Sequence, residues 1–155
     1  MNKKIILASI PLILWMSLIF FFSDQNSSNS GNISESGIKK VITIIINIKD
    51  QAETESKVDA MILVLNPSVR KVGHAIEYFV LGLLMINLFI KLPIHFKKAI
   101  LYSIILTMFY AASDEFHQLF ISGRSGELKD ILLDSMSGTL GIMAYVKLYS
   151  KRTKE

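Results

Sequence analysis

The feature that most constrains this chain is an uninterrupted apolar run, IILASIPLILWMSLIFFF, which spans residues 5–22 without a single charge. At about 1.5 Å of rise per residue, a helix of this length covers roughly the 30 Å hydrocarbon core of a bilayer. Lys3 and Lys4 precede the run, as they would in a signal peptide, but it ends in three phenylalanines and lacks a cleavage motif of small residues. We therefore predict an uncleaved membrane-spanning helix.

Three further apolar segments follow, so the sequence predicts four spans, at about residues 5–22, 73–90, 99–117 and 131–149. The fold class expected is all-α, an integral membrane four-helix bundle, formed by residues 1–155 as a single domain. The hydrophobic fraction, 51%, is only slightly above the globular norm. The prediction therefore depends on where the apolar residues lie and not on how many there are.

The distribution of Lys and Arg predicts the orientation of the bundle, because cationic residues near span ends remain on the cytoplasmic side. Such residues precede the first span, separate the second from the third, and follow the fourth. Both termini are therefore expected in the cytoplasm. This assignment puts nine Lys or Arg and one Glu inside, a net charge of +8, and eight Lys or Arg with twelve Asp or Glu outside, a net charge of −4.

The long connection at residues 23–72 is expected to be extracytoplasmic and to contain two amphipathic helices. Asn32 and Glu35 are typical of a helix N-cap with a capping box, and aliphatic residues recur at helical spacing after them. A second segment, residues 58–65, has the same spacing, and we expect it to end at Asn66-Pro67. Both are predicted to lie on the outer leaflet or to cap the bundle, although the isoleucines also permit a strand at residues 41–48.

Composition and motifs exclude several classes of protein. The absence of cysteine rules out a disulfide scaffold, a thiolate zinc site and a cysteine nucleophile. The basic residues are divided among short segments at span ends and form no basic domain, so we expect no nucleic-acid partner. No phosphate-loop, HExxH or GxSxG motif occurs; we predict no cofactor, and nothing here decides whether the protein is an enzyme.

Polar and ionisable residues gather at one end of the predicted spans. Under the assigned topology they all lie at the extracytoplasmic end, and their helical spacing places them on common inward faces. A charged side chain in the bilayer costs at least about 2.5–3.5 kcal/mol, so such groups usually face the bundle interior and a partner. The set comprises His74, Glu77, Tyr78, Asp114, Glu115, Gln118, Arg124, Asp130 and Asp134.

Candidate roles follow from side-chain chemistry. Arg124, in the Gly-Arg-Ser-Gly segment at residues 123–126, can bind a carboxylate or phosphate in a bidentate way. Glu115 and Asp130 are candidate acid or base groups or orienting partners of that arginine, and His74 is a candidate proton shuttle. The candidate ligand-binding residues are Arg124, His74, Glu77, Tyr78, Asp114, Gln118 and Asp134. A divalent metal is a weaker hypothesis, with His74, Glu77 and Asp114 as the candidate ligands.

Small residues continue the acidic face of the fourth predicted span. Ser137, Gly138 and Gly141 follow Asp134 at helical spacing, and residues of this size let a neighbouring helix approach closely. We therefore expect the polar face and the most closely packed face of this helix to coincide. His117 is expected beside the polar face, at the membrane interface.

The order of these residues resembles the VanZ-like family of small bacterial integral membrane proteins, which is named for a member linked to teicoplanin resistance. The matching segments are residues 22–25, FSDQ, residues 70–74, RKVGH, residues 114–118, DEFHQ, the pair Gly123-Arg124, and Asp130, Asp134 and Gly138. In that family an Asn commonly stands at the position of Asp134 and a Pro at that of Ser122. The resemblance implies a multi-pass protein of the bacterial cytoplasmic membrane that affects glycopeptide susceptibility.

Three interpretations of the polar residues remain open from the sequence. They can form a site that opens to the outer leaflet and binds the headgroup of membrane lipids or lipid-linked envelope precursors, because phosphate is abundant at that depth. They can instead form an ion-pair network, neutralised by Arg124, Arg70 or Lys71, that only holds the helices of a structural or adaptor protein together. Proton or ion translocation is the third, but the cytoplasmic halves of the spans offer no ionisable relay.

Overall fold

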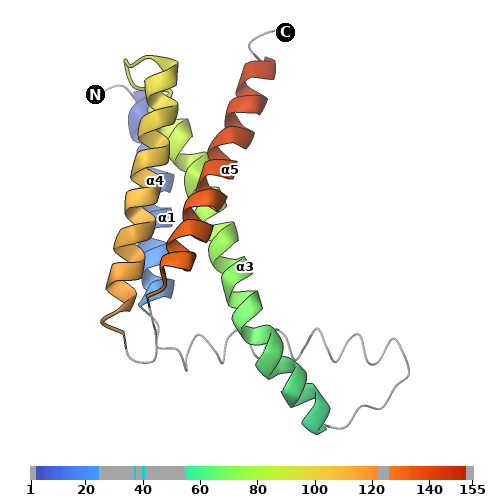
Figure 1. Cartoon of the computed structure of the whole chain (residues 1–155). Helices are drawn as coiled ribbons and strands as arrows, with labels where there is room; N and C mark the ends of the chain where they lie inside the picture. The colour runs from blue at the N-terminus through green and yellow to red at the C-terminus, as the bar shows by residue number, and fades with distance from the viewer. Residues whose placement is uncertain (1–2, 25–36, 38–39, 41–54, 122–125, 153–155) are drawn as a thin grey trace.

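The computed structural model describes residues 3–24, 37, 40, 55–121 and 126–152. Within these residues every regular element is a helix, and four of the helices are long (Figure 1). They are α1 (Lys3–Ser23), α3 (Glu55–Phe89), α4 (Phe96–Gln118) and α5 (Leu128–Arg152). Each contains a stretch long and apolar enough to cross a membrane, at Lys3–Ser23, Ser68–Phe89, Phe96–Gln118 and Leu128–Lys151. The predicted all-α class is confirmed, and each predicted span coincides with a helix that is long and apolar enough to cross a membrane.

A short turn at residues 90–95 joins α3 to α4. The backbone N–H groups of Lys91 and Leu92 each donate to the carbonyl three residues earlier, which tightens the end of α3. Pro93 has no N–H and disfavours helical backbone at the residue before it. α4 then begins after His95, whose backbone is extended (φ −58°, ψ 139°). So short a connection makes α3 and α4 antiparallel neighbours.

The second predicted amphipathic helix does not end where we expected. α3 is continuous from Glu55 to Phe89 and passes through Asn66-Pro67. Proline removes one backbone hydrogen bond, but the bonds on either side can keep the helix continuous, as they do around Pro11 in α1. The segment is therefore an extension of the second span that projects beyond the bundle (Figure 1). Of the first predicted amphipathic segment and the alternative strand, only Gly37 and Lys40 fall within the described residues.

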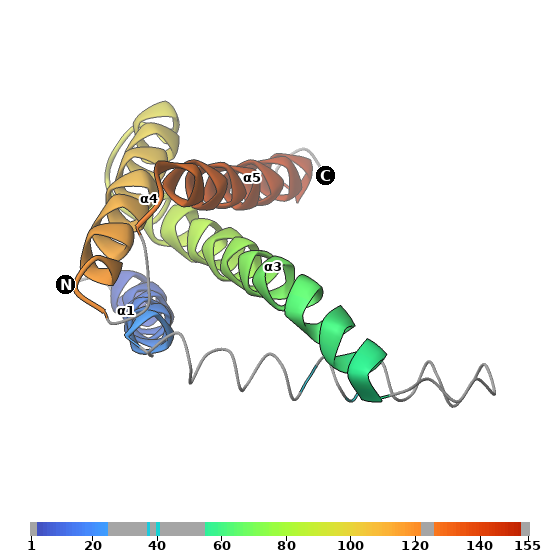
Figure 2. The ribbon, with the colours of Figure 1, turned by 60° about the horizontal axis from the view of Figure 1, so that its bottom comes forward.

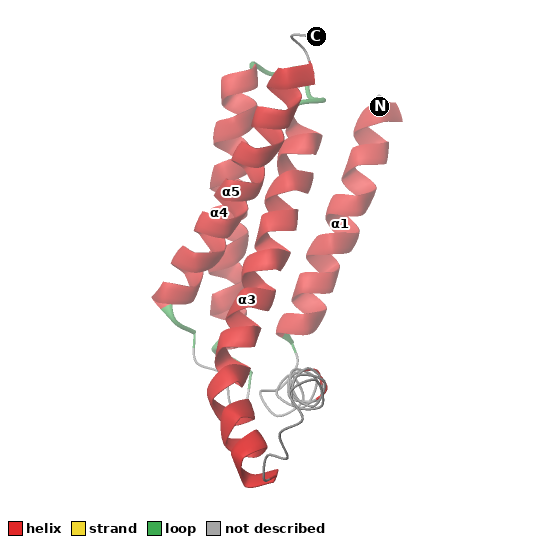
Figure 3. Cartoon of the chain, turned by 90° about the vertical axis from the view of Figure 1, so that its right-hand side faces the viewer, coloured by secondary structure: helices red, strands yellow, loops and turns green. Residues whose placement is uncertain are grey.

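α3 is the central helix of the bundle. It packs against each of the other three and shares its most extensive interface with α5. The two helices cross in the view of Figure 1 and diverge from each other in the view of Figure 2. α4 packs against both α3 and α5, whereas α1 packs mainly against α3 and stands to one side of the bundle in Figure 3. The start of α1 and the end of α5 lie at the same end of the bundle as the α3–α4 turn.

Small residues determine how closely the helices pack. The buried face of α4 carries a small side chain at every fourth position, in the series Ala99, Ser103, Thr107 and Ala111. At the α3–α5 crossing the backbones are in contact: a Cβ added to Gly82 would lie 2.8 Å from the carbonyl carbon of Gly138. A Cβ added to Gly141 would lie 3.0 Å from the carbonyl carbon of Phe79. The small-residue face expected on the fourth span is thus the face against which α3 packs.

The outward faces of the helices are apolar. Leu14 of α1, Phe109 of α4 and Leu140 of α5 are each more than 60% exposed, at 65%, 70% and 63%. Apolar surface of this extent is unfavourable in water and matches the hydrocarbon of a bilayer. Together with the length of the four helices, this surface describes an integral, multi-pass membrane protein.

Candidate functional site

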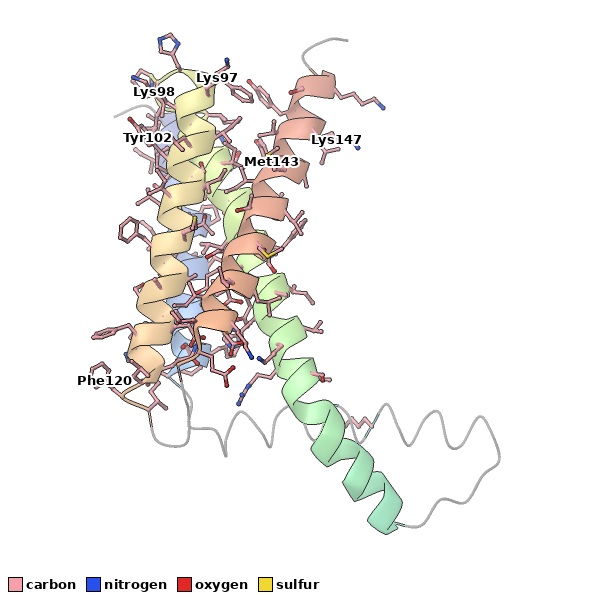
Figure 4. All side chains as sticks on the ribbon, viewed as in Figure 1. Lys97, Lys98, Tyr102, Phe120, Met143 and Lys147 are labelled. Atoms are coloured by element: carbon pink, nitrogen blue, oxygen red, sulfur yellow. The ribbon has the colours of Figure 1, made fainter. Side chains whose placement is uncertain are left out.

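The carboxylates predicted to share the bundle interior come from three helices and lie toward one end of the bundle. Glu77 is on α3, Asp114 and Glu115 are on the last turns of α4, and Asp130 and Asp134 are on the first turns of α5. We call these five residues the acidic cluster. Figure 4 labels Phe120, just beyond α4, near this end of the bundle, and Lys97 and Lys98 at the opposite end.

Three members of the acidic cluster are deeply buried. The exposed fractions of Asp114, Glu115 and Asp134 are 3%, 4% and 1%. Burying an ionised carboxylate is costly unless a cation or several hydrogen-bond donors compensate the charge, and otherwise the group takes up a proton. The cations and hydrogen-bond donors near these three side chains therefore determine the chemistry of the cluster.

Hydrogen bonds satisfy only part of the buried cluster. Gln118 Nε2 donates to Asp114 Oδ2 at 3.2 Å, and the backbone N–H of Glu127 donates to Glu115 Oε2 at 3.0 Å. Within the described residues, Asp114 Oδ1 and both carboxylate oxygens of Asp134 have no hydrogen-bond partner. The Tyr78 hydroxyl is fully buried beside Asp114 without reaching hydrogen-bond geometry.

Asp134 lies where several negative groups meet. The carboxylates of Glu115, Asp114, Asp130 and Glu77 all act unfavourably on a negative charge there. His74 Nδ1 lies 3.9 Å from Asp134 Oδ2, so a protonated imidazole would form an ion pair but not a hydrogen bond at this distance. The site therefore favours either a proton on Asp134 or the approach of a positively charged group.

The exposed rim of the cluster is formed by Lys71, Asp130 and Glu127. Lys71 Nζ donates to Asp130 Oδ1 at 2.7 Å and lies 3.9 Å from Glu127 Oε2. The Lys71 side chain is 44% exposed, so solvent screens this pair and its contribution to stability is modest. Lys71 thus neutralises the rim, as one of the predicted cationic partners, and makes no ion pair with Asp114 or Asp134 in the described structure.

Other predicted residues fall around or outside the cluster. The Glu77 carbonyl accepts a hydrogen bond from Trp15 Nε1 at 2.9 Å, which ties α1 to α3 beside the site. His117 lies 3.3 Å from Asp24 and stacks on Phe20, outside the cluster. Arg124, the predicted anion anchor, lies outside the described residues.

No group of three or more His, Asp or Glu side chains is placed to hold a metal ion in the part of the chain that the structure describes. His74, Glu77 and Asp114, the weak metal candidates, are all within that part and do not form such a group. The buried side chains that the structure brings together here include carboxylates, the Tyr78 phenol and the Gln118 amide. These groups can form hydrogen bonds with a ligand, and the carboxylates can bind protons.

Ser23 is a buried polar residue that the candidate residues from the sequence did not include. It is 1% exposed at the end of α1, and its hydroxyl has no hydrogen-bond partner among the described residues. Its position carried a signal, because Leu12, Ile19 and Ser23 recur at helical spacing and form the buried face of α1. A polar residue that continues such an apolar face points into the interior.

Four spanning helices with buried acids at one end define a multi-pass membrane protein with a polar site inside the bundle. The model of the VanZ/LLP1 family matches residues 8–149, and the chain therefore belongs to the VanZ/LLP1 family. The resemblance noted in the sequence is confirmed, and with it the interpretation as a membrane protein of the cell envelope. A search of curated proteins and a search of solved structures found no match.

Proposed function

We propose that the protein binds the headgroup of a membrane lipid or of a lipid-linked envelope precursor at the acidic cluster, and that this binding contributes to glycopeptide (teicoplanin) tolerance. The supporting observation is that Asp114 and Asp134 are buried while three of their four carboxylate oxygens lack a hydrogen-bond partner among the described residues. Each buried group left unsatisfied costs about 1–3 kcal/mol, and native proteins retain few of them. A headgroup with hydrogen-bond donors or positive charge would satisfy these oxygens.

The proposal assigns roles by depth. Asp130 meets the headgroup at the mouth and Glu115 meets it deeper in the site. Both are candidate acid or base groups if the headgroup reacts, with His74 as the proton shuttle. Glu77, Tyr78 and Gln118 complete the wall of the site.

Arg124 is proposed as the anchor for an anionic part of the same headgroup. A Cβ on Gly126 would lie 2.8 Å from the Glu115 carbonyl oxygen, so Gly126 packs directly on the cluster. Arg124 is two residues before Gly126 in the sequence. Its guanidinium can donate two parallel hydrogen bonds to a phosphate.

The site is proposed to face outward, with both termini in the cytoplasm of the bacterial plasma membrane. The lysines near the opposite end of the bundle support this orientation. Because the chain has no cysteine, single cysteines can report it. On intact cells, an impermeant thiol reagent should label Ser28→Cys and should not label Thr153→Cys. The reverse pattern would place the site on the cytoplasmic side and refute the proposal.

The headgroup proposal is tested with Asp130→Asn and a matched control. Asp24→Asn makes the same chemical change in another acid that lies outside the cluster and is paired with His117. After gentle purification, native mass spectrometry should find bound lipid on the wild type and on Asp24→Asn, and much less on Asp130→Asn. Teicoplanin tolerance should follow the bound lipid, while membrane abundance and melting temperature stay unchanged.

The alternative is a non-enzymatic structural or adaptor protein whose polar residues only pack the bundle. It predicts a purified wild type without lipid, and tolerance that survives in every variant that folds. Either result would refute headgroup binding. A selective loss of tolerance in folded Asp130→Asn would exclude the purely structural role.

A further inference from the structure

The polar side chains of α3 and α5 meet at successive depths beside the acidic cluster. Lys71, His74 and Tyr78 recur at helical spacing on α3, and Asp130 and Asp134 are one turn apart on α5. Lys71 Nζ donates to Asp130 Oδ1 at 2.7 Å, and His74 Nδ1 lies 3.9 Å from Asp134 Oδ2. The two helices therefore face each other with their polar residues in register.

The exposure of these side chains falls from the rim inward. Lys71 and Asp130 are 44% and 25% exposed, His74 is 19% exposed, and Asp134 is 1% exposed. Four residues of α-helix rise about 6 Å, so Asp134 follows Asp130 by that distance along α5. A continuous series of neighbouring polar side chains thus joins the exposed rim to the buried acids.

The deepest level of this series lacks both hydrogen-bond donors and positive charge. Asp114 Oδ1, both oxygens of Asp134 and the Tyr78 hydroxyl have no hydrogen-bond partner among the described residues. The charge of Asp114 acts on Asp134, and both act on Tyr78, so the three side chains form one group. In the part of the chain that the structure describes, no lysine or arginine forms an ion pair with either aspartate.

These two deficits select the chemistry of the ligand. A glycerol or sugar hydroxyl donates a hydrogen bond but brings no charge, and a trimethylammonium group brings charge but has no N–H. A primary ammonium group supplies one positive charge and three N–H donors, which matches the three unpartnered carboxylate oxygens. Its hydrogen bonds to carboxylates are about twice as strong as neutral ones. The deepest level is therefore complementary to a primary ammonium group.

The rim shows the same pairing within the protein itself. The Lys71 side chain places a primary ammonium group on Asp130 at 2.7 Å. That bond uses one of its three N–H groups, so Lys71 can also donate to an anion at the rim. The site thus offers a cation at the rim and carboxylates about one helical turn deeper. A phosphate that carries a short aminoalkyl group has the complementary order of charges.

We infer that the acidic cluster binds the aminoethyl phosphate headgroup of a phospholipid, with the phosphate at the rim beside Lys71 and the primary ammonium group between Asp114 and Asp134. This inference rests on the proposed function and deepens it, because it names one class of lipid. Phosphatidylethanolamine carries this headgroup and serves as the probe.

A series of phospholipids with identical acyl chains tests the inference. Phosphatidylethanolamine and its N-methyl, N,N-dimethyl and N,N,N-trimethyl forms, the last being phosphatidylcholine, share one charge while the number of N–H groups falls. The purified full chain is freed of lipid in detergent and titrated with each, and bound lipid is measured by native mass spectrometry. Affinity should fall with each methyl group and be about tenfold or more lower for phosphatidylcholine than for phosphatidylethanolamine.

Matched variants locate this preference. Asp134→Asn keeps the shape of the side chain and removes its charge, so the preference for phosphatidylethanolamine over phosphatidylcholine should fall severalfold. Asp24→Asn makes the same change outside the cluster, in an acid paired with His117, and should keep the wild-type preference. If Asp134→Asn does not fold, Asp114→Asn tests the other buried aspartate.

Failure of this inference differs from failure of the proposed function. Equal affinity across the methylated series, or a preference that survives in both Asp134→Asn and Asp114→Asn, would overturn the ammonium site. Co-purification of a lipid-linked precursor in place of an aminophospholipid would overturn it as well. If bound lipid and tolerance still depend on Asp130 in these cases, the proposed function stands with another headgroup. A wild type that binds none of the lipids and purifies without any overturns both.

Discussion

The contact between the α3 and α5 backbones predicts a large effect for a single methyl group. In Gly82→Ala the new Cβ would lie 2.8 Å from the carbonyl carbon of Gly138, 3.1 Å from its Cα, and closer still to its oxygen. Non-bonded carbon atoms are comfortable at about 3.5–4.0 Å, so the helices must separate by roughly 0.7 Å or more. Because the contacting atoms are backbone atoms, no side-chain rotation can relieve the contact.

The expected cost follows from this displacement. A gap of about 0.5–1 Å forfeits a quarter to a half of each dispersion contact along the crossing, and overpacking a close-packed interior costs about 1–3 kcal/mol. Alanine recovers about 0.8–1 kcal/mol through its higher helix propensity. We therefore expect Gly82→Ala to lower the free energy of unfolding by up to about 2 kcal/mol.

Gly73→Ala is the matched control, because Gly73 lies on the same helix and nothing lies within 4 Å of a Cβ added there. Gly73→Ala should leave the free energy of unfolding unchanged or raise it by up to about 1 kcal/mol. The free energies of unfolding of both variants can be measured in mixed detergent micelles by circular dichroism as the denaturing detergent is increased. A Gly82→Ala protein as stable as Gly73→Ala would refute the close α3–α5 crossing.

Two further predictions concern charge. Asp134→Asn should leave the melting temperature at neutral pH unchanged or raise it, because it removes a charge opposed by four neighbouring carboxylates; a marked loss of stability would favour a structural ion-pair network. Outside the spans, burial lowers the pKa of Lys91 below its ordinary 10.5, so folding becomes more favourable as the pH rises through the folded pKa towards the unfolded one. The stability of Lys91→Met relative to the wild type should therefore fall as the pH rises towards 10.5, and a constant difference in melting temperature would contradict the assignment.

Helical spacing within single helices anticipated much of the site. Asp114 and Gln118, four residues apart on α4, are hydrogen-bonded to each other, and Asp130 and Asp134 belong to the first turns of α5. Such relations depend only on the helix repeat, so the spacing of residues in the sequence predicts them. The pairing of Lys71 with Asp130, 59 residues apart, depends on how α3 and α5 are rotated about their axes, and spacing does not encode that rotation.

The continuous helix through Pro67 is a case where local signals mislead. Proline and the asparagine before it are typical of a helix end, yet α3 runs through both. The bonds lost at one proline are few compared with those that a helix of 35 residues retains. A rule about one residue type considers a single position, whereas the stability of a helix depends on the hydrogen bonds along its whole length.

By itself the sequence determined the number of spans, their approximate ends and the family, because bilayer thickness and the cost of burying charge act on each segment separately. The tertiary structure decided which oxygens of the acidic cluster lack partners and how closely α3 meets α5 at Gly82. These properties arise from the fit of surfaces far apart in the chain. Packing of this kind depends on shape at the scale of one methyl group, which no one-dimensional pattern records.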